Sequence, residues 1–252
     1  MKEFKPVLSV ITVVYNNAGH IERTLLSVLT QTYPNVEYII VDGASTDGTL
    51  KIINRYRSLI SRLFSEKDDG IYDAMNKGLA AATGDYVIFM NSGDEFYDYS
   101  TVEKVFASAP DADIYYGETE MINGEGESLG RRRHQAPEQF DWTGFKHGMS
   151  ISHQAIYVRS SLVLPFDRRY KLSADIDWII RVAARAKKIV NVHQYVAKYL
   201  VGGMSKAKHR QSLAERFDIM RRYYGFFPTI GNHFVIACNL AKYWLKHRRT
   251  ND

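Results

Sequence analysis

Three polar clusters in the first hundred residues hold side chains that could bind a charged ligand. Each cluster follows an apolar run: Tyr15-Asn16-Asn17 follows residues 7–14, Asp42-Gly43-Ala44-Ser45 follows residues 38–41, and Asn91-Ser92-Gly93-Asp94-Glu95 follows residues 86–90. Carboxylates, amides and an aromatic ring are groups that can contact a base, a ribose, a phosphate or a hard metal ion. We therefore expect a nucleotide and a metal ion to bind where the clusters meet.

Asp42 and Tyr15 are the candidates for contact with a nucleoside. A carboxylate at the end of a parallel strand can accept from ribose or from an N–H of the base, and we favour this role for Asp42 over capping of the next helix. Tyr15 could stack on the base or pack in the core. Lys67 and Asp69 follow a later strand, where they could contact the base or diphosphate or form a solvated charge cluster.

Asp94 is the candidate metal ligand. Mg²⁺ and Mn²⁺ prefer oxygen, and such ions bind through one or two carboxylates together with substrate phosphates. Because Asp94 follows a buried strand, we favour this role over that of an aspartate in a turn. Asn91 could hydrogen-bond phosphate or a metal-bound water. The expected cofactor is Mn²⁺ or Mg²⁺.

The elements that position these clusters are predicted from the hydrophobic pattern. Continuous β-branched runs are typical of strands buried on both faces of a parallel sheet. Amphipathic helical patterns over residues 21–29, 50–57 and 71–82 alternate with these runs and with a short strand at residues 63–65. This order predicts a doubly wound α/β fold, in which ligands bind at the carboxyl ends of the strands.

After residue 100 the pattern becomes irregular. Helices are expected over residues 101–107, 173–186, 212–224 and 232–247, and strands over 112–116 and 151–158, with a strand pair over 189–199 and a hairpin or mobile loop over 117–133. Gly202-Gly203-Met204-Ser205 is expected to form a mobile loop that could close over donor phosphate, with Lys206 and Lys208 nearby.

Composition sets further bounds. The chain has 252 residues, of which 45% are hydrophobic and 24% charged, as in ordinary globular proteins. The single cysteine, Cys238, excludes an internal disulfide and fits a reducing compartment. No apolar run approaches the ~20 residues that a membrane-spanning helix needs. We therefore expect a cytoplasmic protein.

Positive charge is concentrated at the end of the chain. Residues 206–252 carry ten Lys or Arg and three Asp or Glu, whereas the rest of the chain carries 23 against 25. The same segment is rich in Phe, Ile, Leu, Tyr and Trp. A basic amphipathic helix of this kind suits an anionic membrane surface on the inner face of the plasma membrane, although packing on the body or a dimer contact fits equally well.

Four ordered motifs resemble the family 2 glycosyltransferases of GT-A fold. They are residues 9–17, residues 41–49, the run Asp69-Gly70-Ile71-Tyr72-Asp73-Ala74-Met75-Asn76-Lys77-Gly78, and Asn91-Ser92-Gly93-Asp94. The resemblance extends over residues 7–205. The third motif is similar to the subgroup that builds bacterial surface polysaccharides.

The resemblance implies a Rossmann-like, mostly parallel doubly wound sheet with a C-terminal helical tail. Residues 1–210 would form one catalytic domain, with a nucleotide-sugar-binding half over 1–100 and an acceptor half over 101–210, and residues 211–252 would form the basic tail. The implied activity is inverting transfer of a sugar, with a UDP-sugar favoured as donor, to a hydroxyl of a glycan or lipid-linked glycan. Capsule, exopolysaccharide and O-antigen synthesis are the implied settings.

The resemblance also assigns residues. On the donor side it implies Val13, Tyr15, Asn17, Asp42, Lys67, Asp69, Asn76, Asn91 and Gly93, and on the acceptor side His153, Gln154 and Trp178. The family usually shows Asp-x-Asp where this chain has Asn91-Ser92-Gly93-Asp94, so only the last carboxylate remains, with Glu95 beside it.

The catalytic base is implied by the segment Ala174-Asp175-Ile176-Asp177-Trp178, which resembles the Glu-Asp segment of the family. Asp175 takes the place of the base, Ala174 replaces the Glu, and Asp177 is the second candidate. The alternative is an acidic first helical turn, which the helix dipole stabilises.

Other classes fit less well. The chain has no G-x-G-x-x-G after the first strand, as a dinucleotide oxidoreductase would need. Gly43 and Gly48 have the glycine spacing of a P-loop NTPase, but Thr49 stands where the P-loop lysine would follow. A nucleic-acid binder would rest on the basic tail alone. A catalytically impaired nucleotide-sugar-binding module is the main alternative, because the Asp-x-Asp is degenerate.

Overall fold

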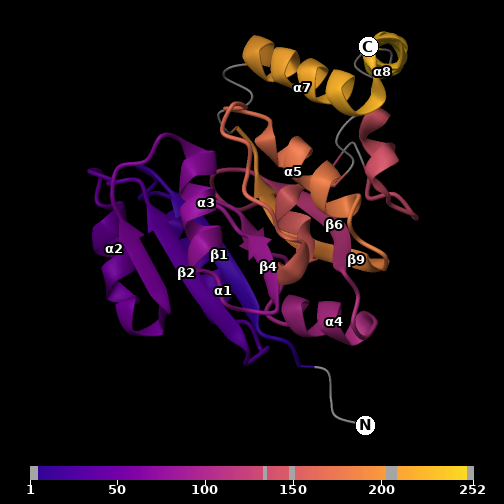
Figure 1. Ribbon diagram of the computed structural model, residues 1–252. Coiled ribbons are helices and arrows are strands. Elements are labelled where there is room, and N and C mark those ends of the chain that lie inside the picture. Colours follow the sequence, from indigo (N-terminus) through magenta and orange to yellow (C-terminus); the bar gives the residue numbers. More distant parts are fainter. Residues whose placement is uncertain (1–4, 133–134, 148–150, 203–208, 249–252) are drawn as a thin grey trace.

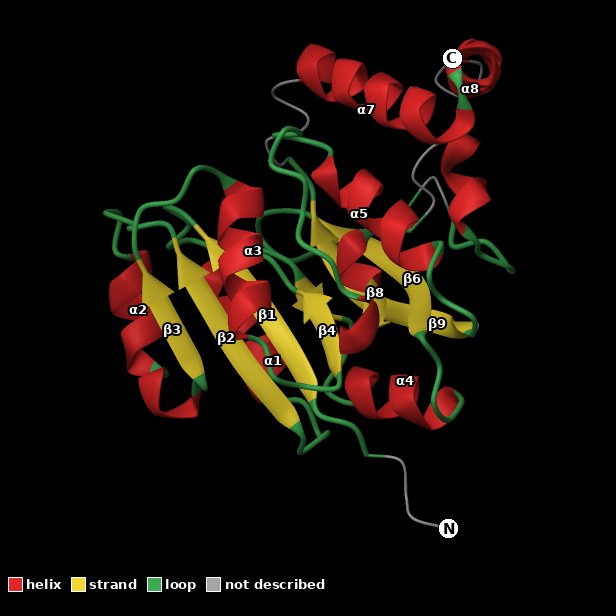
Figure 2. Cartoon of the chain, in the orientation of Figure 1, coloured by secondary structure: helices red, strands yellow, loops and turns green. Residues whose placement is uncertain are grey.

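The structure, a computed structural model, describes residues 5–132, 135–147, 151–202 and 209–248. Figures 1 and 2 show one sheet running through the molecule, with helices on both faces and two C-terminal helices beyond it.

The first half of the sheet is parallel, as the apolar runs predict. Its strands are β1 (Leu8–Val14), β2 (Val36–Asp42), β3 (Arg62–Ser65) and β4 (Tyr86–Phe89), which lie in the order β3-β2-β1-β4. They are connected by α1 (Ile21–Leu29), α2 (Thr49–Arg55), the 3-10 turn η1 (Arg57–Leu59) and α3 (Ile71–Ala81). Every residue of β1 is buried, which confirms a strand covered on both faces.

The second half continues the sheet with mixed direction. The further strands are β5 (Glu95–Phe96), β6 (Ile114–Ile122), β7 (Ser128–Arg131), β8 (Ile156–Arg159) and β9 (Ile189–Leu200). The order beyond β4 is β8-β6-β9-β5, and β7 pairs with β6. Because β8 is antiparallel to β4 whereas β9 is parallel to β6, the α/β sheet is mixed.

In the irregular second half, one expectation is met and two are wrong. A hairpin, the first of the two alternatives given for residues 117–133, is present in the described part of that segment, because β6 continues to Ile122 and pairs with β7, which ends at Arg131. The extended conformation expected for residues 151–155 is wrong, because the turn η3 (His153–Ala155) precedes β8. Two more turns are η2 (Trp142–His147) and η4 (Ser160–Leu162).

The expected strand pair over residues 189–199 is also wrong, because β9 is a single strand of 12 residues. His193 lies within it at φ 52°, a left-handed conformation that side chains with a Cβ seldom adopt. The register of β9 against β6 shifts between Tyr116 and Glu118. A bulge of this kind interrupts the alternation of side chains without ending the strand.

The core lies on both faces of the sheet. On one face Ile11 and Val13 of β1 belong to a cluster with Met75 of α3 and Ile179 of α5 (Ala174–Ala183). On the other face, Leu8, Val10 and Val14 of β1 pack with α1 and with α4 (Thr101–Ser108). The alternating direction of successive β1 side chains thus joins two helical layers.

The C-terminal helices are α7 (His209–Tyr224) and α8 (Phe226–Arg248). Ile219 of α7 is fully buried in the core cluster of α3 and α5. The second helix begins six residues earlier than the expected Asn232, because Pro228 falls in its first turn, where the missing N–H does no harm. Among the described helices, none is both long and apolar enough to cross a membrane.

Candidate functional site

A cleft of about 960 Å³ lies at the carboxyl ends of β1, β2 and β4, where the sheet topology predicts a ligand site. Among the sequence-predicted residues, it is lined by Val13, Tyr15, Asn17, Lys67, Asn91, Asp94, His153 and Asp175. The chain therefore brings donor-side, metal and acceptor-side candidates to one cavity.

One end of the cleft is formed by Tyr15, Gly43 and Asp68. Tyr15 is 65% exposed, so it is not a packed core residue, and its ring is free to stack on a flat ligand. A Cβ on Gly43 would lie 2.5 Å from Asp68 Oδ2 and 3.3 Å from Tyr15 Cδ2. The glycine thus lets the ring and the carboxylate approach each other.

Asp42 lies beneath the cleft instead of lining it. Its side chain is fully buried and accepts hydrogen bonds from the backbone N–H of Ser45 and from Ser65 Oγ, the latter at 2.7 Å. These contacts fix the loop that carries Gly43. The sequence located Asp42 at the strand end, but the strand end does not determine where the carboxylate points.

The charged run after β3 is divided between two surroundings. Lys67 and Asp68 line the cleft. Asp69 points toward Arg168, with which it forms an ion pair, and its side chain is largely exposed. Of the two roles considered for Lys67 and Asp69, Lys67 is therefore placed to contact a ligand, whereas Asp69 belongs to a solvated charge cluster.

The loop after β4 is held in shape by neighbours from distant segments. Asn17 Nδ2 donates to Ser92 Oγ at 2.9 Å, and Leu200 N donates to Asp94 Oδ1 at 3.1 Å. Gly93 has φ 104°, which favours glycine, and a Cβ there would collide with Leu200. Gly93 is not among the lining residues; it shapes the loop that presents Asp94.

Asp94 is a buried carboxyl group with few partners. Burial raises its pKa to about 7, although the charge of His153 and the N–H of Leu200 oppose this. Glu95 points to Arg23, 3.2 Å away, so it does not join Asp94 in a carboxylate pair.

The residues around Asp94 fit a divalent cation shared with a ligand. Asn91 Oδ1 is buried without a hydrogen-bond partner, which leaves an oxygen acceptor beside the loop. Within the described residues there is no group of three His, Cys, Asp or Glu side chains that could enclose a metal. A hard cation that takes most of its oxygens from phosphates and water matches this sparse donor set.

Asp175 lies at the other side of the cleft, in the first turn of α5. Tyr72 OH donates to Asp175 Oδ1 at 3.1 Å, and His153 Nδ1 lies 3.5 Å from Asp175 Oδ2. Asn91 Nδ2 lies 3.0 Å from His153 Nε2. The Asn91 amide and the Asp175 carboxylate thus contact the two ring nitrogens of His153 from opposite sides.

These neighbours keep Asp175 ionised. Burial would raise the pKa of its carboxyl group, but the hydrogen bond and charge of His153 and the charge of Arg216 outweigh burial and hold the pKa below its ordinary value. Arg216 is on α7, and its Nε is buried without a hydrogen-bond partner. A helix that the sequence assigned to the tail therefore acts electrostatically on this site.

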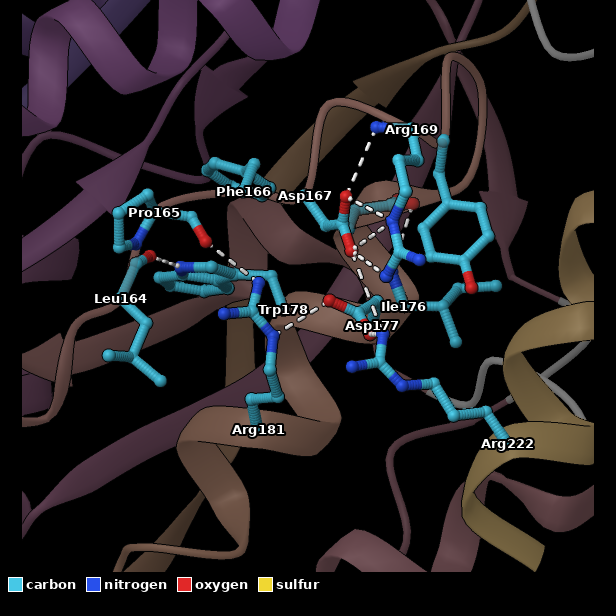
Figure 3. Close-up of polar contacts among 12 residues, drawn as sticks. Leu164, Pro165, Phe166, Asp167, Arg169, Ile176, Asp177, Trp178, Arg181 and Arg222 are labelled. Atoms are coloured by element: carbon cyan, nitrogen blue, oxygen red, sulfur yellow. Dashed lines mark hydrogen bonds and ion pairs between the residues drawn. The ribbon is translucent and has the colours of Figure 1, made fainter.

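Asp177, the second candidate base, has a different environment (Figure 3). It is fully buried, accepts from Arg181 Nε at 2.7 Å and from Tyr223 OH at 2.7 Å, and lies 3.8 Å from Arg222. It is not among the residues that line the cleft. Its contacts join α5 to α7, and they are those of a structural ion pair.

Three other predicted residues support the site from outside the cleft. Trp178 is fully buried, stacks on Phe166 and donates to Leu164 O at 2.7 Å (Figure 3). Asn76 exchanges two hydrogen bonds with the backbone of Phe166. Gln154 is buried, and its Nε2 has no hydrogen-bond partner.

The sequence did not identify Asp68, Tyr72 or Tyr199 as residues of the cleft. Tyr72 lies within the third motif, so its hydroxyl group could have been considered as a hydrogen-bond donor to a ligand or to a nearby carboxylate. Tyr199 reaches the site only because β9 pairs alongside β6, which no local pattern predicted.

Comparison with known families gives one match over most of the chain. The family described as Glycosyl transferase family 2 matches residues 9–163. A "PGL/p-HBAD biosynthesis glycosyltransferase" of Mycobacterium bovis is 32% identical over 252 residues, which cover 96% of this chain and 92% of that protein.

Solved structures are similar in fold. S. aureus TarS 1-349 in complex with UDP-GlcNAc superposes with a TM-score of 0.65 at 18% identity, covering 91% of this chain and 73% of that one. The mannosyltransferase PcManGT of Pyrobaculum calidifontis, in complex with GDP-Man and Mn²⁺, has a TM-score of 0.60 at 19% identity, covering 91% and 69%. At these identities the likeness concerns the GT-A-like fold alone.

Proposed function

Because the chain belongs to glycosyl transferase family 2, we propose that this glycosyltransferase moves a sugar from a nucleotide-sugar donor to an acceptor hydroxyl with inversion at the anomeric carbon. The observation that carries the proposal is the pair Asp94 and Asp175. Both line one cleft, yet burial leaves Asp94 with a raised pKa, whereas His153 and Arg216 keep Asp175 ionised. Two carboxyl groups in contrasting surroundings are suited to two different roles.

In the proposed reaction Asp175 is the general base. The acceptor oxygen attacks the anomeric carbon, the bond from that carbon to the diphosphate oxygen breaks, and the hydroxyl proton moves to Asp175. Tyr72 and His153 contact different oxygens of the carboxylate and so fix its orientation. Asn91 in turn orients the His153 ring.

The donor side is proposed to hold a UDP-sugar. Tyr15 would stack on the base, with Lys67 and Asp68 as polar neighbours, and Asn17, Asn91 and Ser92 would face the diphosphate. One of the two similar structures binds a UDP-sugar and the other a GDP-sugar, so the donor screen described below compares both nucleotides. A divalent cation on Asp94 and the phosphate oxygens would neutralise charge on the leaving diphosphate.

The acceptor is proposed to be a glycan or lipid-linked glycan of the cell surface. The mycobacterial relative is named for PGL/p-HBAD biosynthesis, and a putative teichuronic acid biosynthesis glycosyltransferase of Bacillus subtilis is 43% identical over 99 residues, which cover 38% of this chain. These names support surface glycoconjugates as a class. The narrower settings that we propose are capsule, exopolysaccharide and O-antigen synthesis, with the reaction in the cytoplasm.

The test has two steps. A thermal-shift screen of nucleotide-sugars with Mn²⁺ should identify the donor, because a ligand that binds only the folded state raises the melting temperature. NMR of the product made from that donor should then show the opposite anomeric configuration. Retention of configuration would overturn the proposed single displacement.

The binding-module alternative is less well supported. It accounts for the single carboxylate on the β4 loop, but it gives no role to Asp175, which is held ionised in the same cleft. Turnover of a donor by the native chain, lost in Asp175→Asn, would exclude this alternative.

A further inference from the structure

The first half of α8 exposes large apolar side chains on the outside of the molecule. We define the apolar face of α8 as Phe226, Phe227, Ile230, Phe234 and Val235. Phe227 is 82% exposed and Phe234 is 70% exposed. Phe226, Ile230 and Phe234 follow one another at intervals of four residues, so they lie along one side of the helix.

Apart from Phe226, whose ring centroid lies 6.3 Å from that of Phe217 on α7, this face is not what holds α8 to the rest of the chain. The helix packs on α7 and η2. Thr229 is fully buried, and the ring of His233 lies 5.2 Å from that of Phe217 on α7. The side that carries Thr229 and His233 is therefore the packed side. Figures 1 and 2 show α7 and α8 at the edge of the molecule, away from the N-terminal end of the chain.

The sequence on either side of the face is rich in positive charge. The sequence has no Asp or Glu between Asp218 and Asp252, whereas it has Arg221 and Arg222 before the face and Lys242, Lys246 and Arg248 after it on α8. The side chains of Arg221 and Arg222 are about half exposed, and they pair with Asp218 and Asp167 within the chain, so the unpaired positive charge of the sequence lies mainly after the face. A second copy of this chain would bring two such basic segments together, whereas an anionic surface complements them.

We propose that the apolar face of α8 binds the headgroup region of an anionic lipid bilayer. Aromatic side chains would enter the boundary between headgroups and acyl chains, and the flanking Arg and Lys would contact lipid phosphates. The helix would lie along the surface, since no described helix can span the bilayer. The proposal does not depend on which sugar the cleft takes.

The test is sedimentation of the full chain with vesicles of phosphatidylglycerol and phosphatidylcholine, against vesicles of phosphatidylcholine alone. The unaltered chain should bind the anionic vesicles and be released as salt rises from about 0.1 M to about 0.5 M, because salt screens the attraction. Equal binding to both vesicle types, or no effect of salt, would overturn the proposal.

Matched variants distinguish binding by this face from nonspecific binding by other exposed apolar side chains. Phe227→Ser with Phe234→Ser should weaken partitioning roughly tenfold or more, because insertion scales with buried apolar area. Leu59→Ser with Tyr99→Ser removes two exposed apolar side chains elsewhere and should bind as the native chain does. Native-like binding by the α8 variant would contradict the proposal. So would a native dimer that this variant converts to a monomer in the absence of lipid.

Activity on a soluble acceptor keeps this test distinct from that of the proposed function. The α8 variant should retain its melting temperature and its transfer rate, because neither phenylalanine lines the cleft. Normal vesicle binding by the α8 variant would contradict the assignment of this face to the membrane. Loss of sugar transfer by the variant would contradict the independence of the face from the cleft.

Discussion

Asp175 and Asp177 differ by two positions in one helical turn, and their side chains face opposite surroundings. Asp175 contacts Tyr72 and His153 in the cleft, whereas Asp177 is buried against Arg181 and Tyr223. Two residues along a helix correspond to a rotation of about 200°, so the side chains of Asp175 and Asp177 point to opposite sides of α5. Their substitutions should therefore have different consequences.

Asp175→Asn should reduce kcat by about 10²–10⁴-fold, the usual contribution of a general base. Donor binding should change little, because the base acts on the acceptor. Steady-state kinetics together with donor-induced thermal shift would measure both effects.

Asp177→Asn is the matched control. It should lower the free energy of unfolding by about 3 kcal/mol, since it leaves Arg181 without its buried partner. If Asp177→Asn instead abolishes turnover in a fully folded enzyme, and Asp175→Asn does not, the assignment of the base is reversed.

Asp94 should make metal-dependent donor binding sensitive to pH. Its folded-state pKa is raised to about 7, so below that pH the free carboxyl group holds a proton that a cation must displace. The apparent Kd for Mn²⁺ in the presence of donor should rise about tenfold per pH unit below 7 and level off above it. Calorimetric titrations at pH 5.5, 6.5 and 8 would measure this.

Asp94→Ala provides the comparison for that titration. The variant should lose the Mn²⁺-dependent thermal shift that the donor produces, at every pH. An unchanged shift would mean that the metal is held elsewhere, and a flat pH response of the native chain would contradict the burial argument.

At the scale of elements, the loop between β2 and α2 carries a glycine that sets one end of the cleft. In Gly43→Ala the new Cβ would require Asp68 to move and would press on Tyr15. Because both neighbours are side chains that can shift, stability should fall by less than about 1 kcal/mol. Donor affinity should fall roughly tenfold, a loss of about 1.4 kcal/mol.

Gly19→Ala is the control for this loop substitution, because no atom lies within 4 Å of the position that its new Cβ would take. Isothermal titration with the donor and thermal unfolding of both variants would separate the effects. Equal donor affinity in the two variants would show that the approach of Asp68 and Tyr15 does not shape the donor end.

The elements of the first half could be predicted from the sequence because each is set by local pattern. The apolar runs, the helical spacing of residues 21–29 and the strand at β3 all correspond to observed elements. The second half was predicted less well because pairing between distant strands decides it. β9 continues past His193, which has a positive φ, because residues on both sides of it pair with β6.

The site was predictable to a similar extent. The strand-end rule located Tyr15, Asn91 and Asp94, whose backbone position alone brings them to the cleft. The rule does not determine the direction of a side chain. Asp42 is therefore buried outside the cleft although it ends a strand, whereas Asp68, which the rule did not select, lines the cleft. The effect of Arg216 on Asp175 depends on how α7 packs, which no motif near Asp175 indicates.

At the scale of the whole molecule, α7 is joined to the segment that precedes α5. Glu215 accepts hydrogen bonds from the backbone N–H groups of Lys171 and Leu172, at 3.1 and 2.8 Å. Tyr223 reaches Asp177, and Ile219 is part of the core. The domain boundary at residue 210 stays a prediction, but these contacts tie both sides of it to the position of α5.

Glu215→Ala should therefore disturb the site from a distance. It leaves two backbone N–H groups without an acceptor, so the free energy of unfolding should fall by roughly 1–3 kcal/mol. Because the loop before Asp175 loosens, kcat should fall about tenfold, which corresponds to roughly 1.4 kcal/mol of transition-state stabilisation. Donor-induced thermal shift should persist, since Glu215 does not line the cleft.

Arg221→Ala is the matched control on the same helix. Arg221 pairs with Asp218 across one turn, with both side chains about half exposed, and such pairs contribute less than about 1 kcal/mol. Hydrogen exchange should show faster exchange over residues 171–176 in Glu215→Ala and native exchange there in Arg221→Ala. If both variants match the native chain in exchange and in kcat, then α7 does not position α5, and the electrostatic effect of Arg216 is the sole contribution of α7 to Asp175.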